Sequence, residues 1–249
     1  MSNNDNNRPL AQLAWFSYAL TATLLAISLV WGVYSKGDYG YSFWYEKLDI
    51  AEHIQTYGPH NRYRDGFERL QREDYEQLFA QITRAVHNRG AGLSTITYQP
   101  PGMPATTLLH HDEVVHLQDV ADLIYLGSIA FWVLLLCWLP LAWTVYRLGA
   151  PQIRWRLTSA ALPLVAILLW LLIAGPKAVF YQLHIWLFPP ENPWFFYWEE
   201  SLMATVMKAP YLFGGIAAVI AFGAVVMTPA IYYVGLRVTA RVLSKPAGS

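Results

Sequence analysis

Residues 123–146 read LIYLGSIAFWVLLLCWLPLAWTVY and contain no charged side chain. The hydrocarbon core of a bilayer is about 30 Å thick, and an α-helix needs about 20 apolar residues to cross it. This stretch is therefore long enough to span a membrane as one helix. Pro140 lies inside it, which a membrane helix tolerates because neighbouring helices can satisfy the freed carbonyl group.

Three other stretches have the same apolar character, so the chain is expected to cross the membrane four times. The predicted spans are residues 13–34, 123–146, 157–180 and 211–236. The first span might be mistaken for a secretory signal peptide. Its apolar part is too long for that, and no small-x-small cleavage motif precedes Tyr34. We expect it to be retained as an anchor.

The composition agrees with a membrane protein. Of 249 residues, 55% are hydrophobic and 14% are charged, whereas soluble domains carry about 25% charged residues. Seventeen basic and seventeen acidic residues leave no net charge, and no basic stripe suggests nucleic acid. The single cysteine, Cys137, allows no internal disulfide. The predicted fold class is an all-α polytopic membrane protein with four transmembrane helices and a mostly helical extracytoplasmic domain.

Positive charges in short segments indicate the orientation. Residues 147–156 and 237–249 each carry basic side chains and no acidic one. The positive-inside rule places both, together with the N-terminal residues 1–12, in the cytoplasm. Residues 35–122 and 181–210 are then extracytoplasmic.

The long outer segment is expected to be mainly helical. Apolar residues recur at helical spacing within residues 42–57 and 66–88. Residues 90–104 are rich in Gly, Pro and Thr and are expected to form a loop, with a short strand at residues 94–98.

The first candidate site directly precedes the second span. Asp112, His116 and Asp119 share one face of a helix. A carboxylate beside a histidine can fix its tautomer and leave the other ring nitrogen free as a base. The alternative is a structural role, in which Asp112 and Glu113 only stabilise the start of the helix. A zinc motif needs histidines four residues apart; since His111 and His116 are five apart, no metal site is predicted.

The second candidate site follows the third span. His184 lies in the aromatic segment FYQLHIWLF of residues 180–188. Ionisable side chains at membrane depth are costly and often functional. The alternative is an interfacial histidine whose ring tip reaches water, with Trp194 as an interface anchor. Because His116 precedes an inward-going helix and His184 follows an outward-going one, both are expected near the outer leaflet.

At these residues the sequence resembles the lipoprotein intramolecular transacylase family, bacterial membrane proteins with four spans. One shared element is Glu113 with the residues HLQDV at 116–120. The elements after the third span are His184, Phe188, Trp194, Leu202, Pro210 and Phe213. The chain departs from the family pattern at Leu183, where a phenylalanine is usual, and in the proline-rich residues 189–193.

The resemblance implies that the sn-2 acyl chain of a diacylglyceryl-cysteine moves to the α-amino group of that cysteine, giving a lyso-form lipoprotein. Its catalytic histidines correspond to His116 and His184. We predict that His116 is the base, oriented by Asp119, and that His184 is the acid. The predicted substrate-binding residues are Glu113, Asn192 and Trp194, and the oxyanion partner is Asn192 or a backbone amide near Gly92.

No cofactor is expected, and the expected partners are a diacylglyceryl-lipoprotein and membrane lipid, not nucleic acid. The implied location is the bacterial cytoplasmic (inner) membrane, with both termini cytoplasmic. Two other functions stay open. A non-enzymatic accessory or lipoprotein-binding protein would not need the histidines. A small transporter is disfavoured because no clear inverted repeat and no charge in the middle of a span is evident.

Overall fold

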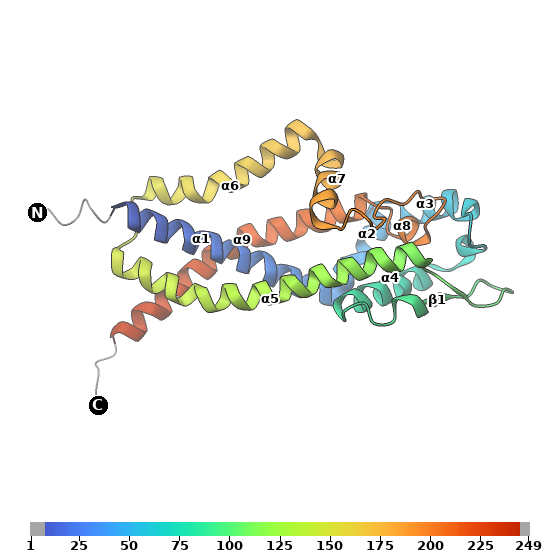
Figure 1. Ribbon diagram of the computed structural model, residues 1–249, viewed down its shortest axis with the longest axis horizontal. Coiled ribbons are helices and arrows are strands. Elements are labelled where there is room, and N and C mark those ends of the chain that lie inside the picture. Colours follow the sequence, from blue (N-terminus) through green and yellow to red (C-terminus); the bar gives the residue numbers. More distant parts are fainter. Residues whose placement is uncertain (1–7, 245–249) are drawn as a thin grey trace, which may run out of the picture. The chain divides into compact units, whose positions relative to one another are not determined.

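The computed structural model describes residues 8–244 and contains four helices that are long and apolar enough to cross a membrane (Figure 1). They are α1 (Arg8–Tyr34), α5 (His111–Leu148), α6 (Ile153–Ala174) and α9 (Tyr211–Ser244). The all-α, polytopic class predicted from the sequence is confirmed. The predicted cytoplasmic termini lie partly outside the described residues, at 1–7 and 245–249.

The chain divides into two compact units. The first comprises residues 1–32, 128–175 and 219–249, and the second comprises residues 33–127 and 176–218. Helices α1, α5 and α9 each contribute residues to both units. The candidate site residues all belong to the second unit.

The first unit is held together around Tyr18, which is fully buried. Its hydroxyl donates to the carbonyl oxygen of Tyr232 at 2.7 Å, which joins α1 to α9. Gly235 permits this approach, because a Cβ there would collide with the Tyr18 hydroxyl and the Trp138 ring. The surrounding core consists of Ala14, Trp15, Ala19, Ala142 and Val145.

The second unit is built from short helices and one small sheet. The helices are α2 (Tyr41–Lys47), α3 (Ile50–Tyr57), α4 (Arg72–His87), α7 (Pro176–Leu187) and α8 (Leu202–Val206). Single 3-10 turns occur at η1 (Ser35–Gly40), η2 (Gly58–His60), η3 (Phe67–Arg69) and η4 (Leu93–Thr95). Strands β1 (Thr97–Tyr98) and β2 (Thr106–Thr107) pair antiparallel.

Helix α4 supplies the core of the second unit. Its buried face carries Tyr75, Leu78, Phe79, Ile82 and Val86. Tyr41 of α2 stacks on Phe79 with ring centroids 4.2 Å apart, and its hydroxyl donates to the carbonyl oxygen of Val206 at 2.7 Å. Tyr41 therefore connects α2 to α4 through the ring stack and to α8 through the hydrogen bond.

Three expected elements differ in detail. The helix predicted for residues 42–57 is interrupted at Asp49, whose φ of 49° lies in the left-handed region. The strand predicted at 94–98 shortens to two residues, because residues 93–95 form a 3-10 turn. The helix predicted through residue 180 ends at Ala174: Gly175 has φ 81°, and Pro176, which has no N–H to donate, begins α7.

Candidate functional site

Two histidines from distant parts of the sequence pack together in the second unit. His116 lies in the second turn of α5 and His184 near the end of α7. Their rings stack at an interplanar angle of 27° with centroids 6.2 Å apart. His116 is 9% exposed, and His184 is half-buried. The two imidazoles therefore lie near enough to contact one substrate.

Aromatic rings enclose the pair. The Phe188 centroid lies 5.0 Å from that of His116 and 5.1 Å from that of His184. Phe180 and Trp194 contact the His184 ring at 4.0 Å and 5.0 Å. Apolar neighbours exclude water, which strengthens electrostatic interactions inside the site.

The tautomer of His184 follows from its contacts. Its Nδ1 lies 2.8 Å from the carbonyl oxygen of Phe180. A carbonyl only accepts, so Nδ1 carries the hydrogen and Nε2 presents a lone pair. Burial lowers the pKa of His184 from its usual value, against the smaller raising effect of the Phe180 bond. At neutral pH the ring is thus neutral and can accept a proton through Nε2.

Among the described residues, the Nδ1 of His116 makes no hydrogen bond of the kind that fixes the tautomer of His184. This His116 nitrogen is buried and has no hydrogen-bond partner within residues 8–244. Since any neutral imidazole has one N–H and one lone pair, a bound substrate can complete the hydrogen bonding of this ring. Such an unsatisfied buried atom is uncommon in proteins and calls for an explanation.

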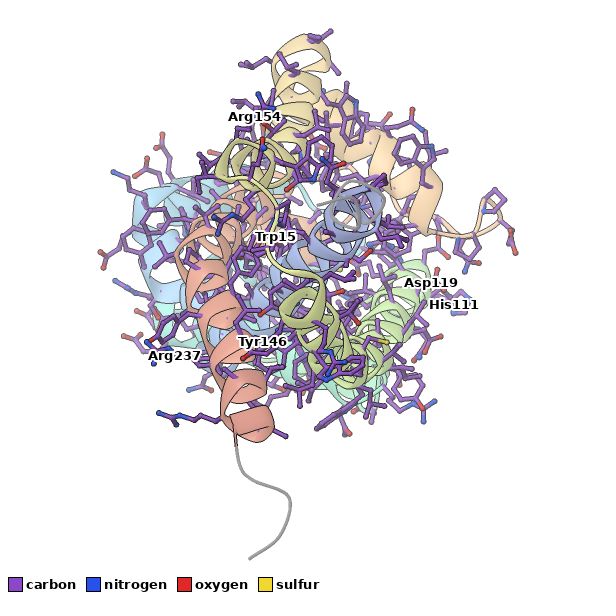
Figure 2. All side chains as sticks on the ribbon, turned by 90° about the vertical axis from the view of Figure 1, so that its left-hand side faces the viewer. Trp15, His111, Asp119, Tyr146, Arg154 and Arg237 are labelled. Carbon is purple, nitrogen blue, oxygen red and sulfur yellow. The ribbon has the colours of Figure 1, made fainter. Side chains whose placement is uncertain are left out.

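Asp119 does not make the contact predicted for it. Its Oδ2 accepts a hydrogen bond from the Asn192 side-chain amide at 2.8 Å, and the Nδ1 of His116 lacks a partner. Figure 2 shows Asp119 and His111 projecting from the same helix, α5. The bond joins α5 to the loop after α7, and it leaves Asn192 with one amide hydrogen to donate elsewhere.

Glu113, predicted to contact substrate, is bonded within the second unit. It is 1% exposed and accepts from the hydroxyl of Ser201 at 2.5 Å and from the backbone N–H groups of Met203 at 3.2 Å and His110 at 2.7 Å. Its oxygens are therefore engaged by the protein itself. A buried charge is stable only when paired or hydrogen-bonded in this way.

Of the other predicted binding groups, Trp194 lies beside the histidine pair, and the loop at Gly92 makes contacts within itself. Trp194 stacks beside His184 and forms part of the aromatic wall. Gly92, with φ 87°, precedes the η4 turn, and its carbonyl oxygen accepts from Thr95 within the same loop. The backbone N–H groups of Leu93 and Thr95 donate to the carbonyl oxygens of Gly90 and Gly92, so these amides bond within the loop.

A groove of about 370 Å³ lies beside the pair and was not predicted. It is lined by Tyr63, Arg64, His110, His111, Asp112, Pro193, Phe195, Phe196 and Glu200. The Phe196 ring lies 5.8 Å from both His116 and His110, so it stands between the pair and the groove. No local sequence pattern marks this groove, because its three wall segments are separated along the chain.

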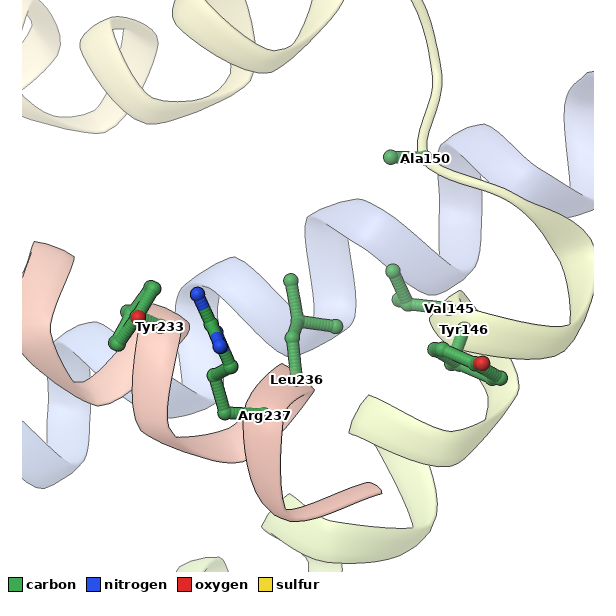
Figure 3. A pocket seen from close by; sticks show the side chains of 6 residues that line it. All are labelled: Val145, Tyr146, Ala150, Tyr233, Leu236 and Arg237. Carbon is green, nitrogen blue, oxygen red and sulfur yellow. The ribbon is translucent and has the colours of Figure 1, made fainter. Parts of the chain in front are cut away.

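A second hollow belongs to the first unit. It has a volume of about 350 Å³ and is lined by Val145, Tyr146, Ala150, Tyr233, Leu236 and Arg237 (Figure 3). Its lining is mostly apolar, and its one cation, Arg237, lies over the Tyr233 ring at 4.8 Å. Across residues 8–244 no group of three or more His, Cys, Asp or Glu side chains is arranged to hold a metal ion.

Fold and site together define the class: an all-α, multi-pass membrane protein in which two histidines meet inside an aromatic enclosure. The sequence matches the family described as lipoprotein intramolecular transacylase Lit over residues 14–212. That range covers most of the chain and includes both histidines. The chain belongs to this family.

A solved structure shares the fold. It is the membrane integral lipoprotein intramolecular transacylase Lit from Bacillus cereus, in a variant with one histidine replaced by arginine. The match has a TM-score of 0.58, covers 96% of this chain and 95% of that chain, and has 13% sequence identity. No curated protein matches the sequence.

Proposed function

We propose that this chain is an acyltransferase that moves the sn-2 acyl chain of a diacylglyceryl-cysteine to the α-amino group of that cysteine. The observation that carries the proposal is the stacking of His116 on His184, 6.2 Å apart, in an aromatic enclosure. Membership of the transacylase family supports the reaction class. The acyl donor and acceptor are on one molecule, so positioning supplies much of the rate and no protein nucleophile is needed.

The reaction requires one proton to move from nitrogen to oxygen. The neutral α-amine attacks the ester carbonyl, and the new C–N bond forms a tetrahedral intermediate. The nitrogen then loses a proton, the bond from carbon to the glyceryl oxygen breaks, and that oxygen takes up a proton as a secondary alcohol. The products are an amide and a lyso-glyceryl group.

The contacts favour His184 as the base, which reverses the roles expected from the sequence. Its Nδ1–H is held by the Phe180 carbonyl, so its Nε2 can accept the proton from nitrogen and return it to the glyceryl oxygen. Neutral His116 then offers an N–H to the developing oxyanion. The amide hydrogen of Asn192 not used by Asp119 is a second donor for that charge.

The proposed location is the bacterial cytoplasmic membrane. Arg147, Arg154 and Arg156 lie in the short connection around the α5–α6 turn, which the positive-inside rule places in the cytoplasm. With four spans, the chain termini are then cytoplasmic and the second unit faces outward. Diacylglyceryl-lipoproteins displayed on that face are the proposed substrates.

The experiment is expression in a bacterium that makes diacylated lipoproteins and lacks a transacylase, followed by mass spectrometry of the N-terminal lipopeptides. Wild type is expected to yield lipopeptides whose acyl chain has moved to nitrogen. His116→Ala and His184→Ala are expected to lower the yield at least about 100-fold, as for loss of a general acid or base. The control is His60→Ala, because His60 is exposed and its Nδ1 bonds locally, to the carbonyl oxygen of Thr56 four residues earlier.

An unmodified lipopeptide from cells that contain folded wild-type protein would contradict the proposal and favour a non-enzymatic lipoprotein-binding role. Equal yields from wild type and both histidine variants would contradict the assignment of the site.

A further inference from the structure

The groove beside Phe196 has a chemistry unlike that of the aromatic enclosure. Its walls come from the loop before η3, the first turn of α5 and the loop after α7. Aromatic side chains, Tyr63, Phe195 and Phe196, alternate with the ionisable groups of Arg64, Asp112 and Glu200. Such a surface suits a ligand with both apolar and hydrogen-bonding parts, and it does not suit an acyl chain.

We propose that this groove binds the first residues of the polypeptide that follows the lipidated cysteine. The inference rests on the proposed function and names where the peptide part of the substrate lies. The reacting amine belongs to the cysteine whose carbonyl group continues into the rest of the lipoprotein. When the amine is at His184 and His116, the polypeptide must leave the site through a polar surface, since its backbone groups need hydrogen-bond partners.

The distances suit this path. Four rings, those of His116, Phe196, His110 and Tyr63, follow one another with centroids 5.8 Å apart at each step. An extended chain covers about 3.3–3.6 Å per residue. The path is therefore long enough for roughly the first four or five residues, beginning directly beside the reaction site.

The charged groups of the groove differ in whether other protein groups already occupy them. Arg64 is held by the carbonyl oxygen of Thr107 at 2.8 Å and that of Tyr63 at 3.0 Å, and Glu200 pairs with Arg62 at 2.6 Å. The exposed Asp112 carboxylate has no hydrogen bond or ion pair within the part of the chain that the structure describes. It is thus available to accept peptide N–H groups, while Tyr63 and Phe195 pack against the backbone.

The test compares two synthetic diacyl substrates with the purified full-length protein: a lipopeptide with five residues after the cysteine, and the corresponding cysteine amide without them. Wild type is expected to use the lipopeptide at least about tenfold better in kcat/KM, equivalent to about 1.4 kcal/mol. Tyr63→Ala and Asp112→Ala are expected to remove most of that preference by lowering only the lipopeptide rate. Phe43→Ala is the matched control, since Phe43 is 60% and Tyr63 57% exposed and Phe43 does not line the groove.

A second measurement does not depend on turnover. A lipopeptide with a photoreactive residue two positions after the cysteine is expected to cross-link to residues 61–64, 110–112 or 193–200. Cross-links confined to other segments, or equal use of both substrates by wild type, would overturn the proposal. If wild type cross-links in the groove and moves no acyl chain, the peptide site stands and the proposed reaction fails.

Discussion

Ser201 donates its hydroxyl hydrogen to Glu113 across 2.5 Å, and the two residues are 88 positions apart in the sequence. The same Ser201 oxygen accepts from the N–H of Ala204 and so caps α8. His116 lies one helical turn beyond Glu113 on α5. The bond therefore fixes where the first turn of α5 sits against the segment before α8, and with it the position of His116 beside Phe196.

Removal of the Glu113 carboxylate is expected to destabilise the second unit strongly. Glu113→Ala leaves the buried Ser201 hydroxyl, the buried Met203 N–H and the partly buried His110 N–H without their acceptor. The expected loss is about 3–5 kcal/mol, because several donors lose their acceptor and each unsatisfied one costs about 1–3 kcal/mol. Ser201→Ala removes two bonds, the one to Glu113 and the one from the N–H of Ala204 that caps α8. The expected loss is about 1.5–3 kcal/mol for the first and about 1 kcal/mol for the cap.

These losses are measurable as lower midpoints of thermal unfolding in detergent. Glu52→Ala is the control, because Glu52 is exposed on α3 and its carbonyl oxygen, not its carboxylate, accepts from Thr56. Unfolding midpoints equal to wild type for Glu113→Ala would contradict the structural role and return Glu113 to substrate binding.

Asp119 gives a direct comparison between the sequence hypothesis and the structure. If its carboxylate oriented His116, Asp119→Asn would reduce kcat by about as much as loss of the histidine. In the structure Asp119 accepts from Asn192, and an asparagine oxygen can accept the same bond. We therefore expect Asp119→Asn to keep activity within about threefold, and Asp119→Ala to lower it about tenfold, as for one lost hydrogen bond.

The readout is kcat on the lipopeptide, with Asn192→Ala as the reciprocal variant. Because Asn192 also has a free amide hydrogen, its loss is expected to exceed that of Asp119→Ala. A collapse of kcat in Asp119→Asn would restore the original assignment of Asp119 as the group that orients a histidine.

Much of the fold was predictable because each spanning helix carries its own signal. Residues 123–146 are apolar throughout, so neither neighbours nor tertiary contacts were needed to assign that helix. The span predicted for residues 157–180 does not resolve the break between α6 and α7, because Ala174 and Phe180, on either side of Gly175–Pro176, are both apolar. The Gly175–Pro176 pair was the available signal for a helix end.

The site was predictable in its histidines and not in their surroundings. His116 and His184 stand out because ionisable groups are rare beside apolar spans. The partners that set their roles are backbone and distant groups: the Phe180 carbonyl holds His184, and Ser201 holds Glu113. Every residue has a backbone carbonyl group, and isolated serines are common, so no sequence pattern could identify either contact.

The pH dependence of kcat tests the role of His184. Burial lowers the pKa of its imidazole below the usual 6.5, and the base must be neutral to accept a proton. Activity is therefore expected to be full at neutral pH and to fall only as the pH drops through the lowered pKa, below 6.5. The measurement is kcat at saturating lipopeptide between pH 4.5 and 8.5, since kcat reports groups in the enzyme–substrate complex.

His184→Gln is the informative companion. Its residual activity is expected to lack this acidic limb, whereas a limb that persists unchanged in His184→Gln would assign the titration to another group.

His53 is expected to make the stability of the second unit sensitive to acid. It is 6% exposed in α3, packs edge-on against Trp198 at 4.5 Å, and its Nε2 lacks a partner among the described residues. Burial, aided by the charge of Lys208, lowers its pKa to about 4, against about 6.5 in an unfolded chain. Between pH 6.5 and about 4 the unfolded state therefore binds a proton at His53 that the folded state does not bind. The contribution to stability is full above pH 6.5 and falls progressively toward pH 4.

One pKa unit corresponds to about 1.4 kcal/mol, so the loss between pH 7 and pH 4.5 is expected to be about 2–3 kcal/mol. His53→Phe keeps an aromatic ring against Trp198 and cannot titrate. It is expected to match wild type at pH 7 within about 1 kcal/mol and to unfold at a higher temperature than wild type at pH 4.5. Carboxylates titrate in both proteins, so the decisive quantity is the difference between their unfolding midpoints. A difference that does not change with pH would show that the pKa of His53 is the same in the folded and unfolded states, which would contradict the prediction.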